Sequence, residues 1–118
     1  MHELSICQAT LKQILDIGQS YPNHVVSCIT LKIGPLSGVE PFLLEQAFPL
    51  ASINTIAENA ELIIEHLPVK ILCLQCDTES KTPPNRLLCQ KCGAWQTKLI
   101  SGDEMLLASL EFQELTIE

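Results

Sequence analysis

Two Cys-x-x-Cys hooks constrain the fold more strongly than any other feature of this sequence. Cys73 and Cys76 form the first hook, and Cys89 and Cys92 form the second after an interval of twelve residues. Each hook offers two sulfurs on one tight turn, so that the pair can close a tetrahedron around one zinc ion. Catalytic zinc keeps a coordination position open for water, whereas four thiolates leave none. The spacing therefore predicts a structural Zn(II) site at these four cysteines.

Two other readings of the hooks are a redox Cys-x-x-Cys pair and a pair of disulfides. A redox pair would not need the second hook, and disulfides do not suit a reducing compartment. About thirty residues around the hooks hold few apolar groups, so we expect no core of their own there, and zinc binding would supply the folding energy.

The composition limits the partners and the location of the chain. The 118 residues are 47% hydrophobic and carry a formal net charge of −7. Such a charge argues against a protein held to nucleic acid by phosphate contacts. No apolar run is long enough to cross a bilayer, and the N-terminus lacks the basic and apolar regions of a signal peptide. We therefore expect a cytoplasmic protein with neither a nucleic-acid nor a membrane partner.

The charge is unevenly distributed along the chain. Residues 70–98 hold five Lys and Arg against two Asp and Glu, a formal +3. The remainder holds two lysines against twelve acidic residues, a formal −10. Four thiolates with one Zn²⁺ would lower the first value by two without removing the asymmetry. It indicates two surfaces with different partners or different duties.

Hydrophobic periodicity predicts two helices and three strands. The helices are expected over 4–18 and 41–51, and the strands over 24–33, 61–67 and 105–112. Because strands lie on both sides of the hooks, the zinc region interrupts one domain. The prediction is an α+β fold with a small mixed sheet and two helices, formed by residues 1–69 and 99–118. A zinc-ribbon-like domain, residues 70–98, is inserted into it.

Several finer expectations follow from local patterns. Ser37 and Glu40 fit a capping box ahead of the second helix, and Pro49 should distort or end that helix. Cys7 and Cys28 are expected to be buried as small apolar side chains. His24 and His66 are expected to be structural or surface residues. The core face of the last strand is expected to comprise Leu106, Ala108, Leu110 and Phe112.

The N-terminus is a second candidate metal site. The amine of Met1, the backbone nitrogen of His2 and the His2 side chain can chelate one ion in small fused rings. Glu3 can add a backbone nitrogen or a carboxylate oxygen and complete a plane, and square-planar N,O coordination suits Ni(II) or Cu(II). The first amides of a helix have no intrahelical acceptor, so binding metal there breaks no helical hydrogen bond. The alternative is that His2 is a solvated end residue.

Three segments together carry a resemblance to a known family. They are MHELS at Met1–Ser5, IGPLSGVEP at Ile33–Pro41 and SGDE at Ser101–Glu104, and they occur with the two hooks in this order. The chain resembles the HypA/HybF family, the nickel metallochaperones of [NiFe]-hydrogenase maturation, which also serve urease in some organisms. The resemblance covers essentially the whole chain.

The resemblance implies a nickel carrier that is not an enzyme. Ni(II) would bind through His2, with Met1 and Glu3 beside it, on the αβ domain, and Zn(II) would bind at the four hook cysteines. The implied partners are the GTPase of nickel insertion and the hydrogenase large subunit, and the chain would be a monomer or a homodimer. The alternative function is a zinc-ribbon module that binds nucleic acid or a protein complex. This alternative predicts a basic face and aromatic stacking residues. A redox enzyme is the third option.

Overall fold

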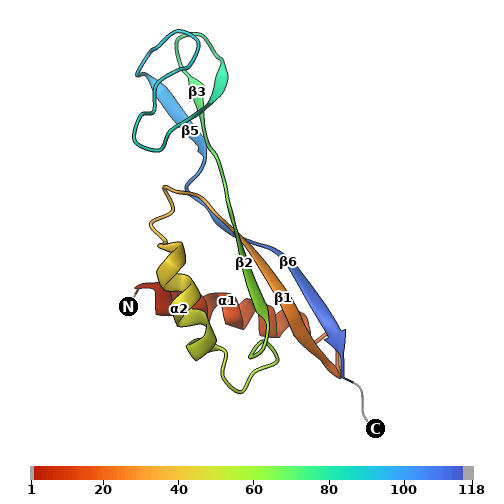
Figure 1. Cartoon of the computed structure of the whole chain (residues 1–118). Coiled ribbons are helices and arrows are strands. Elements are labelled where there is room, and N and C mark those ends of the chain that lie inside the picture. Colours follow the sequence, from red (N-terminus) through yellow and green to blue (C-terminus); the bar gives the residue numbers. More distant parts are fainter. Residues whose placement is uncertain (1, 116–118) are drawn as a thin grey trace. The chain divides into compact units, whose positions relative to one another are not determined.

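The computed structural model describes the backbone of residues 2–115 and the side chains of residues 3–115 (Figure 1). The chain is α+β, as predicted, and forms two compact units. Unit 1 comprises Met1–Leu31, Val39–Ile64 and Leu107–Glu118, and unit 2 comprises Lys32–Gly38 and Glu65–Leu106. The elements in order are α1 (His2–Gly18), β1 (His24–Ile33), α2 (Pro41–Ala51), β2 (Glu61–His66), β3 (Val69–Cys73), β4 (Glu79–Thr82), β5 (Thr97–Ser101) and β6 (Met105–Glu114).

One three-stranded sheet has the order β2-β1-β6. Strand β2 precedes the cysteine hooks and β6 follows them, yet both pair with β1, so the chain returns to the same sheet after the hooks, as predicted. The predicted limits of the inserted domain, residues 70–98, stay a prediction.

Helices α1 and α2 of unit 1 pack against each other. Cys7 and Ile14 of α1 are fully buried, and Leu44 of α2 is 1% exposed. The thiol of Cys7 donates to the Leu44 carbonyl at 3.8 Å. The predicted burial of Cys7 and of Cys28 is confirmed.

The N-terminus of α2 differs from the prediction. Its N-cap residue is Glu40, no side chain makes a capping hydrogen bond, and Pro41 occupies the first turn. The capping-box prediction is wrong because Ser37 lies earlier, in a turn where its N–H donates to the Gly34 carbonyl at 3.1 Å. Proline suits the first helical position because its fixed φ is helical and its missing N–H would have no intrahelical acceptor. The helix ends at Ala51, soon after Pro49, as expected.

The predicted core face of β6 is only half correct. Leu110 and Phe112 are half-buried, but Leu106 and Ala108 are exposed. The alternation changes phase along the strand, because Leu107 is half-buried as well. The phase changes between Leu107 and Leu110, where Ala108 and Ser109 are both exposed. No single alternating face therefore runs through the strand.

Unit 2 contains a second three-stranded sheet that the sequence analysis did not predict. Its order is β4-β3-β5, and both pairs are antiparallel. Val69, Ile71 and Cys73 of β3 alternate as buried residues, with Val69 2% exposed and Ile71 fully buried. Within the predicted limits, residues 70–98, Ile71 is the one buried aliphatic side chain, beside Cys73 and Cys89, which agrees with the expectation that these residues form little core of their own. The core is small, and the cysteine cluster lies at its end.

The three segments of unit 2 that lead to its sheet meet at two glycines. The N–H of Gly34 donates to the Glu104 carbonyl at 2.8 Å, and the N–H of Leu36 donates to the Gly102 carbonyl at 2.8 Å. A Cβ on Gly34 would overlap the Gly102 carbonyl, and a Cβ on Gly102 would press on the backbone of Val69. Glycine is thus required where these backbones cross.

Candidate metal centre

The four hook cysteines come together at one end of unit 2. Their Sγ atoms all lie within 4.8 Å of one another. Two pairs are closer: Cys73 to Cys92 and Cys76 to Cys89, each at 3.6 Å. Four sulfurs at the usual Zn–S distance in a tetrahedron are about 3.8 Å apart. The thiols therefore fit a tetrahedral zinc ion, and none of the chain's six cysteines, all in the described residues, forms a disulfide.

Both hooks direct backbone amides at their first sulfur. Cys73 Sγ accepts from the amides two and three residues later, at 3.3 and 3.4 Å. Cys89 Sγ accepts from the equivalent amides at 3.4 Å each. Hydrogen bonds of this kind favour the charged thiolate over the neutral thiol. The turns thus prepare two of the four sulfurs for a cation before any ion binds.

Each hook is closed by a residue in the left-handed conformation. Asp77 has φ 55° and Gly93 has φ 77°, and each lies four residues after the first cysteine of its hook. Their N–H groups donate to the carbonyls of Cys73 and Cys89 at 3.0 and 2.9 Å. Sequence analysis overlooked Asp77, although its spacing from Cys73 equals that of Gly93 from Cys89.

The four thiols and the amides around them shift the pKa values of Cys89 and Cys92 in opposite directions. The N–H of Cys92, followed by that of Lys91, lowers the pKa of the Cys89 thiol to about 6. The N–H of Ala94 acts to lower the pKa of Cys92, but the neighbouring thiols, Cys73 first, outweigh it and raise it to about 11. Four negative sulfurs so close together repel one another. A divalent cation removes that repulsion, so the donor set and its charge suit Zn(II).

The predicted nickel ligands are the first three residues of the chain. Met1 and the side chain of His2 lie outside the described residues, and the backbone of His2 opens the helix. Glu3 is half-buried, and its Oε2 accepts a hydrogen bond from the Glu40 amide at 3.4 Å. The structure thus links Glu3 to the N-cap residue of α2, while the ligand roles of all three residues stay predictions.

The other histidines have the structural or surface positions expected of them. His24 Nδ1 donates to the Pro22 carbonyl at 2.9 Å, and its ring lies edge-on to Tyr21 at 6.1 Å. His66 is exposed at the end of β2. Across the described side chains, the cysteine cluster is the one group of His, Cys, Asp or Glu close enough to hold a metal ion. No helix in the described residues is long and apolar enough to cross a membrane.

Comparison with known proteins gives the family. The family described as "Hydrogenase/urease nickel incorporation, metallochaperone, hypA" matches residues 1–112. The hydrogenase maturation factor HypA of Nitrosospira multiformis is 44% identical over 111 residues, 94% of this chain and 96% of that protein. The HypA of Aquifex aeolicus is 44% identical over 113 residues, 96% of this chain and 98% of that protein.

Solved structures agree on the fold. The solution structure of the Ni metallochaperone HypA from Helicobacter pylori superposes with a TM-score of 0.68 at 23% identity and covers 98% of both chains. A second HypA solution structure gives a TM-score of 0.71 at 24% identity, over 100% of this chain and 98% of that one. The resemblance drawn from the N-terminal, glycine-rich and hook motifs is confirmed. The chain belongs to the HypA family of nickel metallochaperones, which serve nickel incorporation into hydrogenase or urease and are not enzymes.

Proposed function

We propose that this chain carries Ni(II) as cargo at its N-terminus and delivers it during the maturation of [NiFe]-hydrogenase, with urease as a second recipient. His2 is the main ligand, and the Met1 amine and Glu3 complete the set. The observation that carries the proposal is that α1 begins at His2. The ligand amides are then those of the first helical turn, which have no acceptor within the helix.

Electrostatics at the helix start make Glu3 necessary. The helix dipole places partial positive charge at the N-terminus of α1, which opposes a cation. The carboxylate of Glu3 offsets that charge, and a deprotonated His2 amide adds to the effect. A carboxylate has several acceptor positions, so Glu3 can keep its hydrogen bond to the Glu40 amide while another lone pair faces the metal.

Delivery of Ni(II) to a partner requires a site that binds the ion and can also release it. A chain end offers few protein ligands and stands open to an incoming ligand from a partner. The partners we infer are the nickel-insertion GTPase and the hydrogenase large subunit, in the cytoplasm. This fits Ni(II) as a cargo, since planar N,O donors suit it better than they suit zinc.

The hook cysteines bind a different metal, and its role is structural. Cys73, Cys76, Cys89 and Cys92 would hold Zn(II), which supplies charge neutralisation and folding energy to unit 2. Because four thiolates saturate a tetrahedron, no position remains for substrate, and the site is structural. The N–H groups around Cys73 and Cys89 orient the sulfurs and hold them ready for the ion.

Nickel titration of untagged protein tests the cargo site. The wild type should bind one equivalent of Ni(II), and His2→Ala should abolish that binding while the zinc content and the circular dichroism spectrum stay unchanged. An N-terminal extension before Met1 should also weaken binding, because it removes the amine. Glu3→Gln keeps an acceptor for the Glu40 amide but loses the charge, so it should weaken nickel binding without loosening the helix. Unchanged nickel affinity in His2→Ala would refute the assignment.

Metal analysis tests the zinc ligands. Cys73→Ser and Cys92→Ser should each lose stoichiometric zinc and the order of unit 2. Cys28→Ala is the matched control, because Cys28 is 8% exposed but lies outside the cluster. It should keep one zinc per chain. Full zinc content in either hook variant would show that the ligand set is wrong.

A further inference from the structure

Helix α2 is apolar around almost its whole circumference. Of its 11 residues, only Glu45 and Gln46 are polar. Leu44 and Phe48 account for the buried side, at 1% and 3% exposure. A helix at a protein surface normally carries polar residues on its outer face, and one that is apolar all round is normally buried. The outer face of α2 therefore exposes apolar side chains that a helix of this composition would normally bury.

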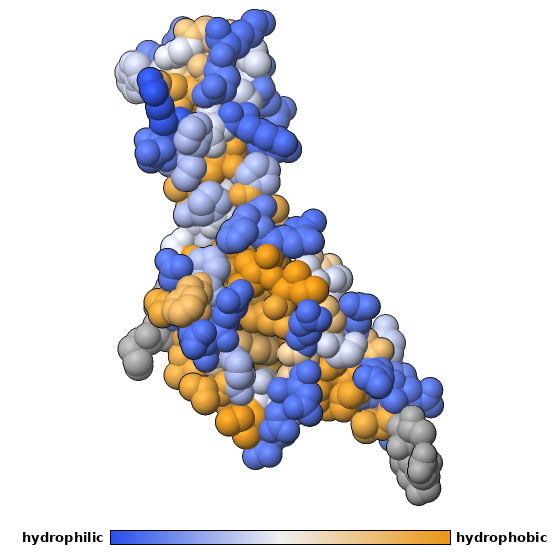
Figure 2. Space-filling view, in the orientation of Figure 1, coloured by the Kyte–Doolittle hydropathy of each residue, from blue (hydrophilic) through white to orange (hydrophobic). Residues whose placement is uncertain are grey.

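The uncovered side chains of α2 and of the residues just after it are large. Phe42 is 63% exposed and Leu50 is 70% exposed, and Ile53, just past the helix end, is 52% exposed. Phe42 and Leu50 are eight residues apart and lie on one side of α2 with the exposed Gln46 between them, and Ile53 follows the end of the helix. We refer to these three exposed apolar side chains as the stripe. Figure 2 shows apolar surface over the α2 and β2 part of unit 1. Contiguous apolar patches on soluble proteins commonly mark interaction sites.

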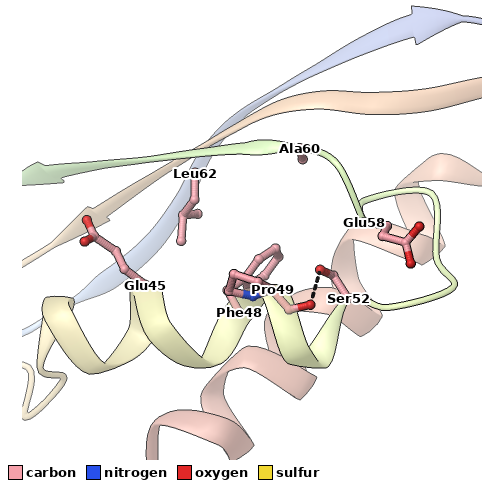
Figure 3. Close-up of a pocket in the computed structure, with 7 residues that line it drawn as sticks. All are labelled: Glu45, Phe48, Pro49, Ser52, Glu58, Ala60 and Leu62. Carbon is pink, nitrogen blue, oxygen red and sulfur yellow. Dashed lines mark hydrogen bonds between the residues drawn. The ribbon is translucent and has the colours of Figure 1, made fainter.

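A groove of about 340 Å³ adjoins the stripe on the side of β2. Phe48 and Pro49 of α2 face Leu62 of β2 across it, and Glu45 and Glu58 lie toward its opposite ends (Figure 3). Glu58 is held in place because its Oε2 accepts from the Asn54 amide at 2.8 Å. Pro49 lies on the helix between the groove and the exposed stripe, so the two form one continuous surface. We call this surface, Phe42, Leu50, Ile53 and the groove, the α2 surface.

The negative charge of unit 1 distinguishes between the possible binding partners of the α2 surface. Unit 1 contains nine Asp and Glu residues against a single lysine, Lys12, a formal −8. A second copy of this unit, a nucleic acid or an anionic membrane would each bring like charge to it. A partner segment with lysine or arginine beside its apolar side chains would bring the opposite charge to Glu45 and Glu58.

We propose that the α2 surface binds a basic amphipathic segment of a partner protein. Apolar side chains of that segment cover Phe42, Leu50 and Ile53 and enter the groove, and its cations lie against Glu45 and Glu58. This surface uses no proposed metal ligand, so the inference is independent of the nickel site.

A fluorescently labelled amphipathic peptide of leucine and lysine serves as the probe, titrated into zinc-loaded protein. Leu50→Ser and Phe42→Ser should each weaken binding about tenfold, because each removes the burial of one large apolar side chain. Ile17→Ser is the matched control, since Ile17 is an exposed apolar residue, 38%, of the same acidic unit on α1. It should bind as the wild type does. Glu45→Gln should weaken binding a few-fold and reduce its dependence on salt.

A peptide of equal charge with serine in place of leucine separates specific from purely electrostatic attraction. It should bind at least tenfold more weakly, and equal binding of the two peptides would overturn the proposal. So would an equal loss in Ile17→Ser and Leu50→Ser. Two further assays test the other possible occupants of the α2 surface. Sedimentation measures dimerisation, and pelleting measures binding to phosphatidylglycerol vesicles. If the wild type shows either one and Leu50→Ser abolishes it, the proposal is overturned. Unchanged nickel stoichiometry and circular dichroism in Leu50→Ser show that the variant is folded.

Discussion

Gly93, which closes the second hook, permits a test of whether a left-handed backbone conformation at this position contributes to zinc binding. Gly93 adopts φ 77°, which an L-residue with a Cβ rarely does, and its N–H donates to the Cys89 carbonyl at 2.9 Å. An added Cβ would meet no atom within 4 Å. Gly93→Ala therefore changes only the conformational preference of the backbone, with no steric clash.

The magnitude follows from two opposing effects. Holding alanine in the left-handed region costs about 1–2 kcal/mol. Alanine also restricts the unfolded chain, which returns about 0.4–1 kcal/mol to the folded state. The net loss is about 1 kcal/mol, or about fivefold in the zinc dissociation constant, because zinc binding and folding of the hook are coupled. Gly93→Asn should lose less, since asparagine tolerates this conformation, as Asp77 does at φ 55° in the first hook.

Competition with a chromophoric chelator at fixed pH measures these changes. The expected order of zinc affinity is wild type, then Gly93→Asn, then Gly93→Ala, within one order of magnitude. Equal affinity of all three would mean that position 93 does not need a left-handed residue. A hundredfold loss in Gly93→Ala would mean that a side chain clashes there, contrary to the open space around the glycine.

Three further outcomes are expected. Gly34→Ala should strongly lower the midpoint of thermal unfolding, because its Cβ would overlap the Gly102 backbone. Gly38→Ala is the milder variant: the space around Gly38 is open, and holding alanine at φ 80° should lower the free energy of unfolding by about 1 kcal/mol. The Gly102 amide lowers the pKa of Glu104, so this carboxylate stabilises the fold above its unfolded pKa and the gain is lost as the pH falls through the folded value. Glu104→Gln should therefore lower the melting temperature at neutral pH and converge with the wild type in acid. Removal of zinc by a chelator should speed amide hydrogen exchange in β3 and leave α1 protected, and equal loss in both would contradict a role confined to unit 2.

Patterns that depend on local periodicity were read correctly from the sequence. The helices, β1 and the flanking strands β2 and β6 follow from apolar spacing, and the four-cysteine cluster follows from the hook spacing. The capping box failed because a favourable residue pattern does not reveal where the chain turns: Ser37 is used in a turn closed by the Gly34 carbonyl. The β6 face failed because the prediction assumed one unbroken alternation, whereas Ala108 and Ser109 are both exposed and the half-buried positions shift phase between Leu107 and Leu110.

Strands β3, β4 and β5 were missed for a different reason. Their alternation is short, and only Val69, Ile71 and Cys73 among their apolar side chains are buried, all in β3, so the pattern barely exceeds that of a loop. The sheet adjoins the first hook: β3 ends at Cys73, and β5 begins at Thr97, whose Cα partner in the sheet is Cys73. One predicted metal ligand thus lies at the end of the sheet. A small sheet of this kind depends on the cluster as much as the cluster depends on the sheet, which is why zinc content, sheet protection and hook geometry should change together in every variant that disturbs one of them.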